Sequence, residues 1–177
     1  IALERLYTTT GAWEELVDVL QRRVPLERDE AAQRAIARRG ALVLEEKIGD
    51  LSRAIEAHRE VSSNFGPDRE TLHSLARLYE SAGRYTDLLE TLEADVEFCE
   101  SAEERAALRF RIADLLRDKL SEPERAIAMY DAALEDDPEH AGSLAALDAI
   151  MADESSQFRR EAARAAAPRY EQLQRYD

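Results

Sequence analysis

Four arginines recur in two pairs along this chain, and their type and spacing point to a binding surface. Arg5 returns 72 residues later as Arg77, and Arg39 returns at the same interval as Arg111. The planar guanidinium of arginine can donate two parallel hydrogen bonds to one carboxylate. Repeated arginines at equivalent places therefore predict a surface that binds acidic groups. The alternative is that each arginine pairs with a nearby Glu or Asp of its own surface, a common arrangement that contributes little to stability.

The other reactive side chains form no catalytic or metal-binding pattern. His58, His73 and His140 fall on different predicted helices without the spacing of metal ligands. His58 matches Tyr130 in the repeat, which predicts that it fills a packing position between helices. Cys99 lies close to two glutamates, which disfavour the reactive thiolate form. We therefore expect no enzyme activity, no metal and no cofactor.

Charge and composition narrow the class of partner. The chain has a formal net charge of −14, whereas a general nucleic-acid binder needs a basic surface that displaces counterions. The acidic stretch 131–139 lacks the twelve-residue loop of a calcium site and predicts a solvated helix end. No apolar run approaches the roughly 20 residues that span a bilayer. We therefore expect a protein or peptide partner, with no nucleic acid and no membrane insertion.

A gapless repeat of 72 residues organises the chain. The segment 3–7, Leu-Glu-Arg-Leu-Tyr, returns at 75–79 as Leu-Ala-Arg-Leu-Tyr, and Arg-Ala-Ile at 53–55 returns unchanged at 125–127. A fixed period of this kind is typical of solenoids, in which each unit buries its apolar face against its neighbour. Residues 3–72 and 75–144 are thus expected to be two copies of one structural unit.

The hydrophobic pattern is helical almost throughout. Trp13, Leu16, Val17 and Leu20 share one face of a helix, and the same stripe recurs one period later. The pattern predicts ten helices at about 1–9, 13–24, 28–47, 51–63, 67–81, 85–98, 102–119, 122–135, 138–152 and 156–176. Short connections make consecutive helices antiparallel. Each 72-residue copy therefore holds two helical hairpins of roughly 36 residues.

Residues at the breaks predict how the helices end and begin. Glycines suited to the left-handed conformation follow four helices, at Gly11, Gly49, Gly66 and Gly83. Ser101 with Glu104, and Ser121 with Glu124, each have the spacing of a capping box. Pro138, after an aspartate cap, is expected at the first position of the next helix.

These features resemble the tetratricopeptide repeat, a hairpin module of about 34 residues. The residues that carry the resemblance are Leu75, Ala76, Tyr79, Gly83 and Tyr85 in one module, and Ala126, Tyr130, Asp137 and Pro138 in another. The resemblance covers about residues 1–150. The tryptophan typical of the first helix is absent, and the modules containing Gly49 and Ser121 are each one residue longer before the turn. Residues 153–177 lack a glycine turn, and Pro168 predicts a kink there.

The resemblance implies an all-α, right-handed α–α solenoid of antiparallel hairpins. We expect a repeat array at 1–152 and a capping or degenerate repeat helix at 153–177. The excess of arginine over lysine, 22 against two, is typical of a GC-rich genome and predicts a bacterial source. The first helix starts about six residues short of its counterpart in the second copy, so we expect a fragment of a larger protein. In that family the first helix of each hairpin lines a concave groove. This implies five partner-binding residues, Arg5, Arg39, His73, Arg77 and Arg111. The expected function is a scaffold that binds an acidic protein or peptide through the groove or the array edges; the alternative is an architectural spacer.

Overall fold

The computed structural model describes residues 2–173, which contain ten α-helices and no β-strand. This confirms the predicted all-α fold of helical hairpins. The chain divides into two compact units, Ile1–Arg84 and Tyr85–Asp177. Each unit is described by itself below.

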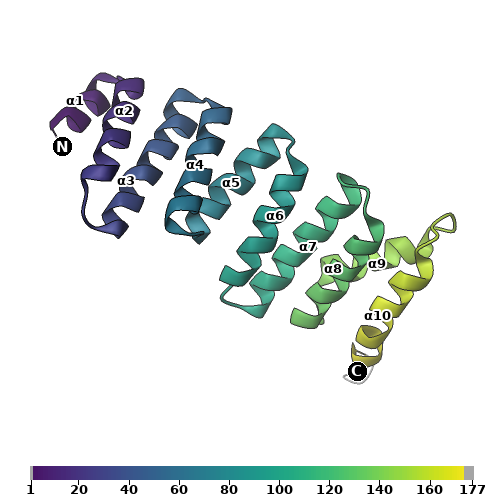
Figure 1. The fold of residues 1–177 in the computed structure, drawn as a ribbon. Coiled ribbons are helices and arrows are strands. Elements are labelled where there is room, and N and C mark those ends of the chain that lie inside the picture. Colours follow the sequence, from purple (N-terminus) through teal and green to yellow (C-terminus); the bar gives the residue numbers. More distant parts are fainter. Residues whose placement is uncertain (1, 174–177) are drawn as a thin grey trace. The chain divides into compact units, whose positions relative to one another are not determined.

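The first unit is a series of helices in which each packs on the next (Figure 1). Its elements are α1 (Ala2–Thr10), α2 (Trp13–Arg23), the 3-10 turn η1 (Val24–Leu26), α3 (Glu30–Val43), the π-helical turn η2 (Leu44–Ile48), α4 (Leu51–Phe65) and α5 (Arg69–Ala82). In hairpin terms, α1, α3 and α5 are first helices, and α2 and α4 are second helices.

The second unit continues the same alternation. Its elements are α6 (Tyr85–Asp95), the 3-10 turn η3 (Val96–Phe98), α7 (Ala102–Asp118), α8 (Pro123–Asp136), α9 (Ala141–Ala152) and α10 (Arg159–Leu173). Helix α10 runs through Pro168 and packs on both α8 and α9. The predicted boundary at 152/153 stays a prediction, and the expected helical residues 174–176 lie outside the described part of the chain.

The 72-residue register governs where elements begin. Helix starts recur at this interval in four pairs, Trp13 with Tyr85, Glu30 with Ala102, Leu51 with Pro123, and Arg69 with Ala141. The 3-10 turns η1 and η3 obey the same interval. The helices and turns of the two copies thus begin at equivalent residues, so the two copies share one local architecture.

The repeated apolar positions form the core. Eight residues at apolar positions that recur in both copies are all at most 5% exposed: Leu16, Leu20, Ala54, Ile55, Leu88, Leu92, Ala126 and Ile127. Burying a leucine side chain contributes about 1.5–3 kcal/mol relative to leaving it exposed. The stripe that identified the helices in the sequence is therefore also what holds them together.

Wider turns absorb the extra residue of the longer modules. In the first unit the N–H groups of Gly49 and Asp50 both bond to the carbonyl of Leu44, at 2.9 and 3.2 Å. The bond from Gly49 spans five residues, which is the pattern of a π-helix rather than an α-helix. The second unit makes the equivalent adjustment, because the N–H of Leu120 bonds to the carbonyl of Leu115 at 3.2 Å.

The helix caps agree with the sequence in part. The capping interaction at Ser101 is confirmed, since the N–H of Glu104 donates to its hydroxyl at 3.1 Å. The predicted capping box at Ser121 is wrong. Helix α8 begins with Pro123, its cap position is Glu122 without a side-chain bond, and Ser121 adopts a left-handed φ of 57°. The register explains this, because Ser121 occupies the place of Gly49, whose φ is 74°.

Pro138 is not the first residue of a helix, contrary to expectation. The N–H of Asp137 still bonds to the carbonyl of Ala133, so this aspartate ends α8 rather than starting α9. Helix α9 begins three residues after the proline, at Ala141. His140 caps it, with its ring Nδ1 accepting the N–H of Ser143 at 3.2 Å.

Replacing Ser121 by glycine should stabilise the protein. A left-handed conformation costs an L-residue about 1–2 kcal/mol, a cost that glycine does not bear. We expect Ser121→Gly to raise the free energy of unfolding by about 0.5–1 kcal/mol in urea titrations. The matched control is Ser63→Gly, at an exposed site within α4, where glycine should be destabilising. A loss of stability in Ser121→Gly would contradict the assigned turn.

Candidate functional site

Arginines on the first helices of the first unit are held by glutamates of the preceding first helix. Arg39 on α3 places Nη1 2.9 Å from Oε2 of Glu4 on α1. Arg77 on α5 places Nη2 2.5 Å from Oε1 of Glu45 in η2. Each pair therefore joins one hairpin to the next through their first helices.

Glu4 is the more enclosed of the two glutamates. It is only 4% exposed, and it also accepts a 2.7 Å hydrogen bond from Nη1 of Arg23 on α2. Burial alone would raise the pKa of Glu4, but the hydrogen bond and the charge of Arg23, with the charge of Arg39, outweigh it and lower this pKa. The carboxylate thus stays ionised and connects α1, α2 and α3.

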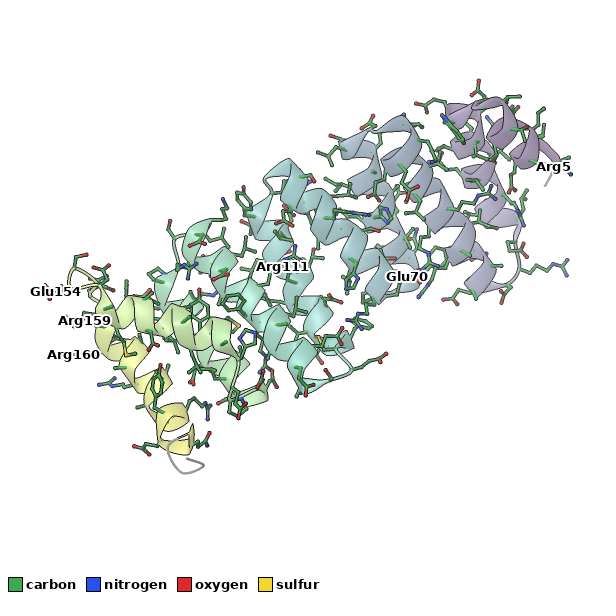
Figure 2. All side chains as sticks on the ribbon, turned by 180° about the vertical axis from the view of Figure 1, so that it is seen from behind. Arg5, Glu70, Arg111, Glu154, Arg159 and Arg160 are labelled. Atoms are coloured by element: carbon green, nitrogen blue, oxygen red, sulfur yellow. The ribbon has the colours of Figure 1, made fainter. Side chains whose placement is uncertain are left out.

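A second link between first helices lies at the start of α5. Asp68 caps this helix by accepting the N–H of Thr71 at 3.0 Å. Arg34 and Arg38 of α3 place Nη1 atoms 3.6 and 3.7 Å from the Asp68 carboxylate. Arg38 also pairs with Glu70, which is labelled in Figure 2. Ion pairs therefore join α3 to the start of α5, as Glu45 of η2 joins to Arg77 further along α5.

The five predicted binding residues do not share one geometry. Arg39 and Arg77 are engaged by carboxylates of their own chain, which is the alternative raised from the sequence, although their side chains remain 47% and 62% exposed. Arg5 is exposed on α1 and makes no ion pair with the described residues (Figure 2). His73 on α5 and Arg111 on α7 are exposed but have contacts of their own. The structure brings Arg5, Arg39 and Arg77 onto successive first helices of one unit, and Arg111 belongs to the other unit.

His58 fills a packing position, as the repeat predicted. It is 0% exposed on α4, as is its counterpart Tyr130 on α8. Its Nε2 lies 3.3 Å from Oε2 of Glu45, so that this glutamate stands between the imidazole and Arg77. Nδ1 of His58 has no hydrogen-bond partner among the described residues. Burial lowers the pKa of His58, against the opposing charge and hydrogen bond of Glu45.

The second unit places different groups at the same positions. Tyr130 donates a 2.6 Å hydrogen bond to Asp114 and accepts one of 2.6 Å from Nη1 of Arg117. Arg117 stands where the first unit has Glu45. Sequence reasoning missed the two glutamates that anchor the arginines, because neither recurs in the second copy: Glu4 is matched by an alanine and Glu45 by an arginine.

The described residues contain no cluster of three or more His, Cys, Asp or Glu side chains that could hold a metal ion. Among the same residues, no helix is both long enough and apolar enough to span a membrane. The ion pairs around Glu4, Glu45 and Asp68 join different helices, whereas others, such as Arg59 with Glu56, lie within one helix.

The tetratricopeptide repeat model matches residues 1–32 and 71–106. These two matches support a tetratricopeptide repeat assignment. No curated protein matches the chain. The two matched stretches cover α1 and α2 in the first copy, and most of α5 with all of α6 in the second. The starts of α2 and α6, Trp13 and Tyr85, share the 72-residue register.

Tetratricopeptide repeats generally mediate interactions between proteins, and the fold is a non-enzymatic scaffold. In this chain the first helices of the tetratricopeptide hairpins carry the partly exposed arginines. The candidate functional site is therefore the surface formed by Arg5, Arg39 and Arg77 on α1, α3 and α5, which we call the arginine face.

The buried His58 should make stability fall in mild acid. Because its pKa is lowered in the folded state, the unfolded chain takes up a proton first as the pH drops below about 6.5. Stability contributed by the neutral imidazole is thus complete above that pH and lost below it. Replacing His58 by Phe should reduce the loss between pH 7 and pH 5 by about 1 kcal/mol, measured as free energy of unfolding in urea.

The control for this experiment is His73→Phe, on the exposed side of α5. The control variant should keep the wild-type pH dependence, whatever its absolute stability. An unchanged pH dependence in His58→Phe would show that the groups facing this imidazole, Glu45, Arg77 and Asp68, compensate its protonation.

Proposed function

We propose that the chain is a scaffold that binds an acidic segment of a partner protein along the arginine face of its first unit. The observation that carries this proposal is the way Arg39 and Arg77 are held. Each uses one guanidinium nitrogen to bind a glutamate of its own chain, while about half of its side chain stays exposed. A guanidinium has five N–H donors, so donors remain for a carboxylate of the partner.

Preorganisation supports this proposal. An arginine anchored by a glutamate has already lost much of its rotamer freedom, so less entropy is lost when a partner binds. Arg5, which has no ion pair among the described residues, adds an uncompensated positive charge on the neighbouring first helix. Locally the three cations Arg5, Arg23 and Arg39 face two carboxylates, those of Glu4 and Glu27, in a chain whose net charge is −14.

The spacer function has its own supporting observation. The same ion pairs that preorganise Arg39 and Arg77 also satisfy them, as expected for side chains that only join hairpins. In a spacer, Arg39 and Arg77 would stabilise the stack and bind nothing else.

An acidic-peptide array separates the two functions. The scaffold should bind glutamate- and aspartate-rich peptides, and affinity should fall with added salt, because exposed charges are screened over about 8 Å at physiological ionic strength. The double variant Arg5→Ala, Arg77→Ala should weaken binding about fivefold, equivalent to about 1 kcal/mol.

The matched control is Arg59→Ala, which removes an exposed arginine from the second helix α4. This variant should bind as the wild type does. Failure of every acidic peptide to bind, or equal binding by the double variant and the wild type, would favour the spacer.

A further inference from the structure

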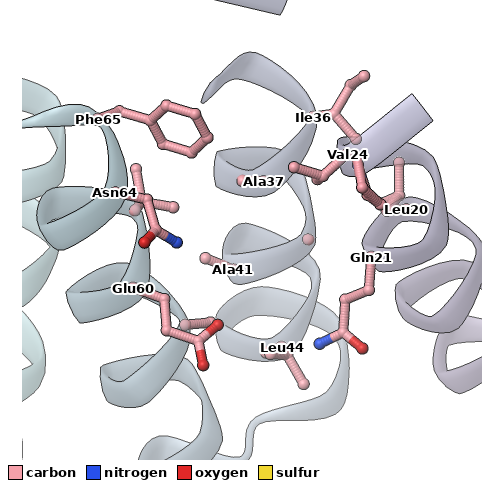
Figure 3. A pocket seen from close by; sticks show the side chains of 14 residues that line it. Leu20, Gln21, Val24, Ile36, Ala37, Ala41, Leu44, Glu60, Asn64 and Phe65 are labelled. Carbon is pink, nitrogen blue, oxygen red and sulfur yellow. The ribbon is translucent and has the colours of Figure 1, made fainter. Parts of the chain in front are cut away.

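A pocket of about 400 Å³ lies between α2, α3 and α4 of the first unit (Figure 3). Its floor is apolar and includes the buried side chains of Leu20, Leu44 and Val61. Its polar lining includes Glu60 and Asn64 of α4, both exposed. The pocket is thus a partly apolar hollow with a carboxylate and an amide beside it.

The repeat explains why this hollow exists. Four of its lining residues are small, and three of these, Ala37, Gly40 and Ala57, differ from their counterparts in the second copy. At the same places in the second copy, 72 residues later, stand Arg109, Ile112 and Met129. The first unit thus has small residues where the second unit has three large side chains. A Cβ added at Gly40 would meet only Leu20 within 4 Å, at 3.9 Å, so the space beside α3 is open.

The second unit shows what kind of side chain fits. Arg109 crosses from α7 to α8, where its Nη1 donates to the carbonyl of Ala132 at 2.8 Å and lies 2.8 Å from Oδ2 of Asp136. By the register, Ala132 and Asp136 correspond to Glu60 and Asn64. In the second unit these two positions bind Arg109. In the pocket the same positions offer one carboxylate and one amide oxygen, and no arginine lines it.

We propose that this pocket is a socket for an arginine side chain of a partner protein. The methylene groups of the incoming arginine pack on Leu20 and Val61, and its guanidinium donates hydrogen bonds to the carboxylate of Glu60 and to the amide oxygen of Asn64. Glu60 has no ion pair among the described residues, so its charge is available. The socket is distinct from the arginine face and selects the opposite charge.

The test uses N-acetyl-arginine amide as the probe. Its binding is detected from the changes in backbone amide chemical shifts of the whole chain in solution. The neutral isostere N-acetyl-citrulline amide is the comparison ligand. Shifts should concentrate at Gly40, Glu60 and Asn64, and the arginine probe should bind at least about tenfold more tightly than citrulline. Equal binding of the two probes, or shifts confined to residues outside the pocket, would overturn the proposal.

Two variants sharpen this test. Glu60→Gln should weaken the arginine probe about tenfold, whereas Glu56→Gln, one turn earlier on α4 and outside the pocket, should leave its affinity unchanged. The double variant Ala37→Arg, Asn64→Asp rebuilds the pair made by Arg109 and Asp136, and so should abolish probe binding. Retained binding in a folded double variant, or an equal loss in Glu60→Gln and Glu56→Gln, would contradict the socket.

Discussion

The close approach of helices at small residues is the constraint on which the rest of this structure depends. Ala54 on α4 and Ala126 on α8 are both fully buried at the same repeat position, and Ala41 and Ala113 are buried on the facing first helices. A larger side chain at such a crossing would force neighbouring helices apart, since interiors are packed to crystal-like density. The alanines therefore set the distance at which every other side chain of a hairpin must find its partner.

The polar residues around these alanines differ between the two copies, and the proposed binding surfaces are formed by such residues. The position of Glu45 becomes Arg117 in the second unit, and that of His58 becomes Tyr130, yet the two positions keep a part-buried hydrogen-bonded pair. Likewise, the replacement of Arg109 by Ala37 turns a filled space into a pocket. Equivalent positions thus retain their geometry while their charge and volume differ between copies.

The fold was largely predictable from the sequence, because the signals that define it are local and repeated. Glycines after helices, apolar stripes and the 72-residue register all act within a few residues or recur at a fixed interval. The pairings of Glu4 and Glu45 could not be predicted, because they join different helices through residues that do not recur. The left-handed conformation of Ser121 could have been predicted, because Ser121 aligns with Gly49 in the repeat. The spacing of Ser121 and Glu124 instead favoured a capping box, which was wrong.

The π-helical turn η2 has a consequence for the angular phase of the hairpins. One extra residue in an α-helix would rotate everything after it by about 100°. In η2 the additional residue is instead taken up by widening a single turn before Gly49, and the equally long module of the second unit widens its turn between Leu115 and Leu120. An insertion is thereby confined to the place where it occurs. Modules of unequal length can then follow one another without a change in the rotation of the later helices. The chain therefore tolerates changes in length that a strictly α-helical connection would not.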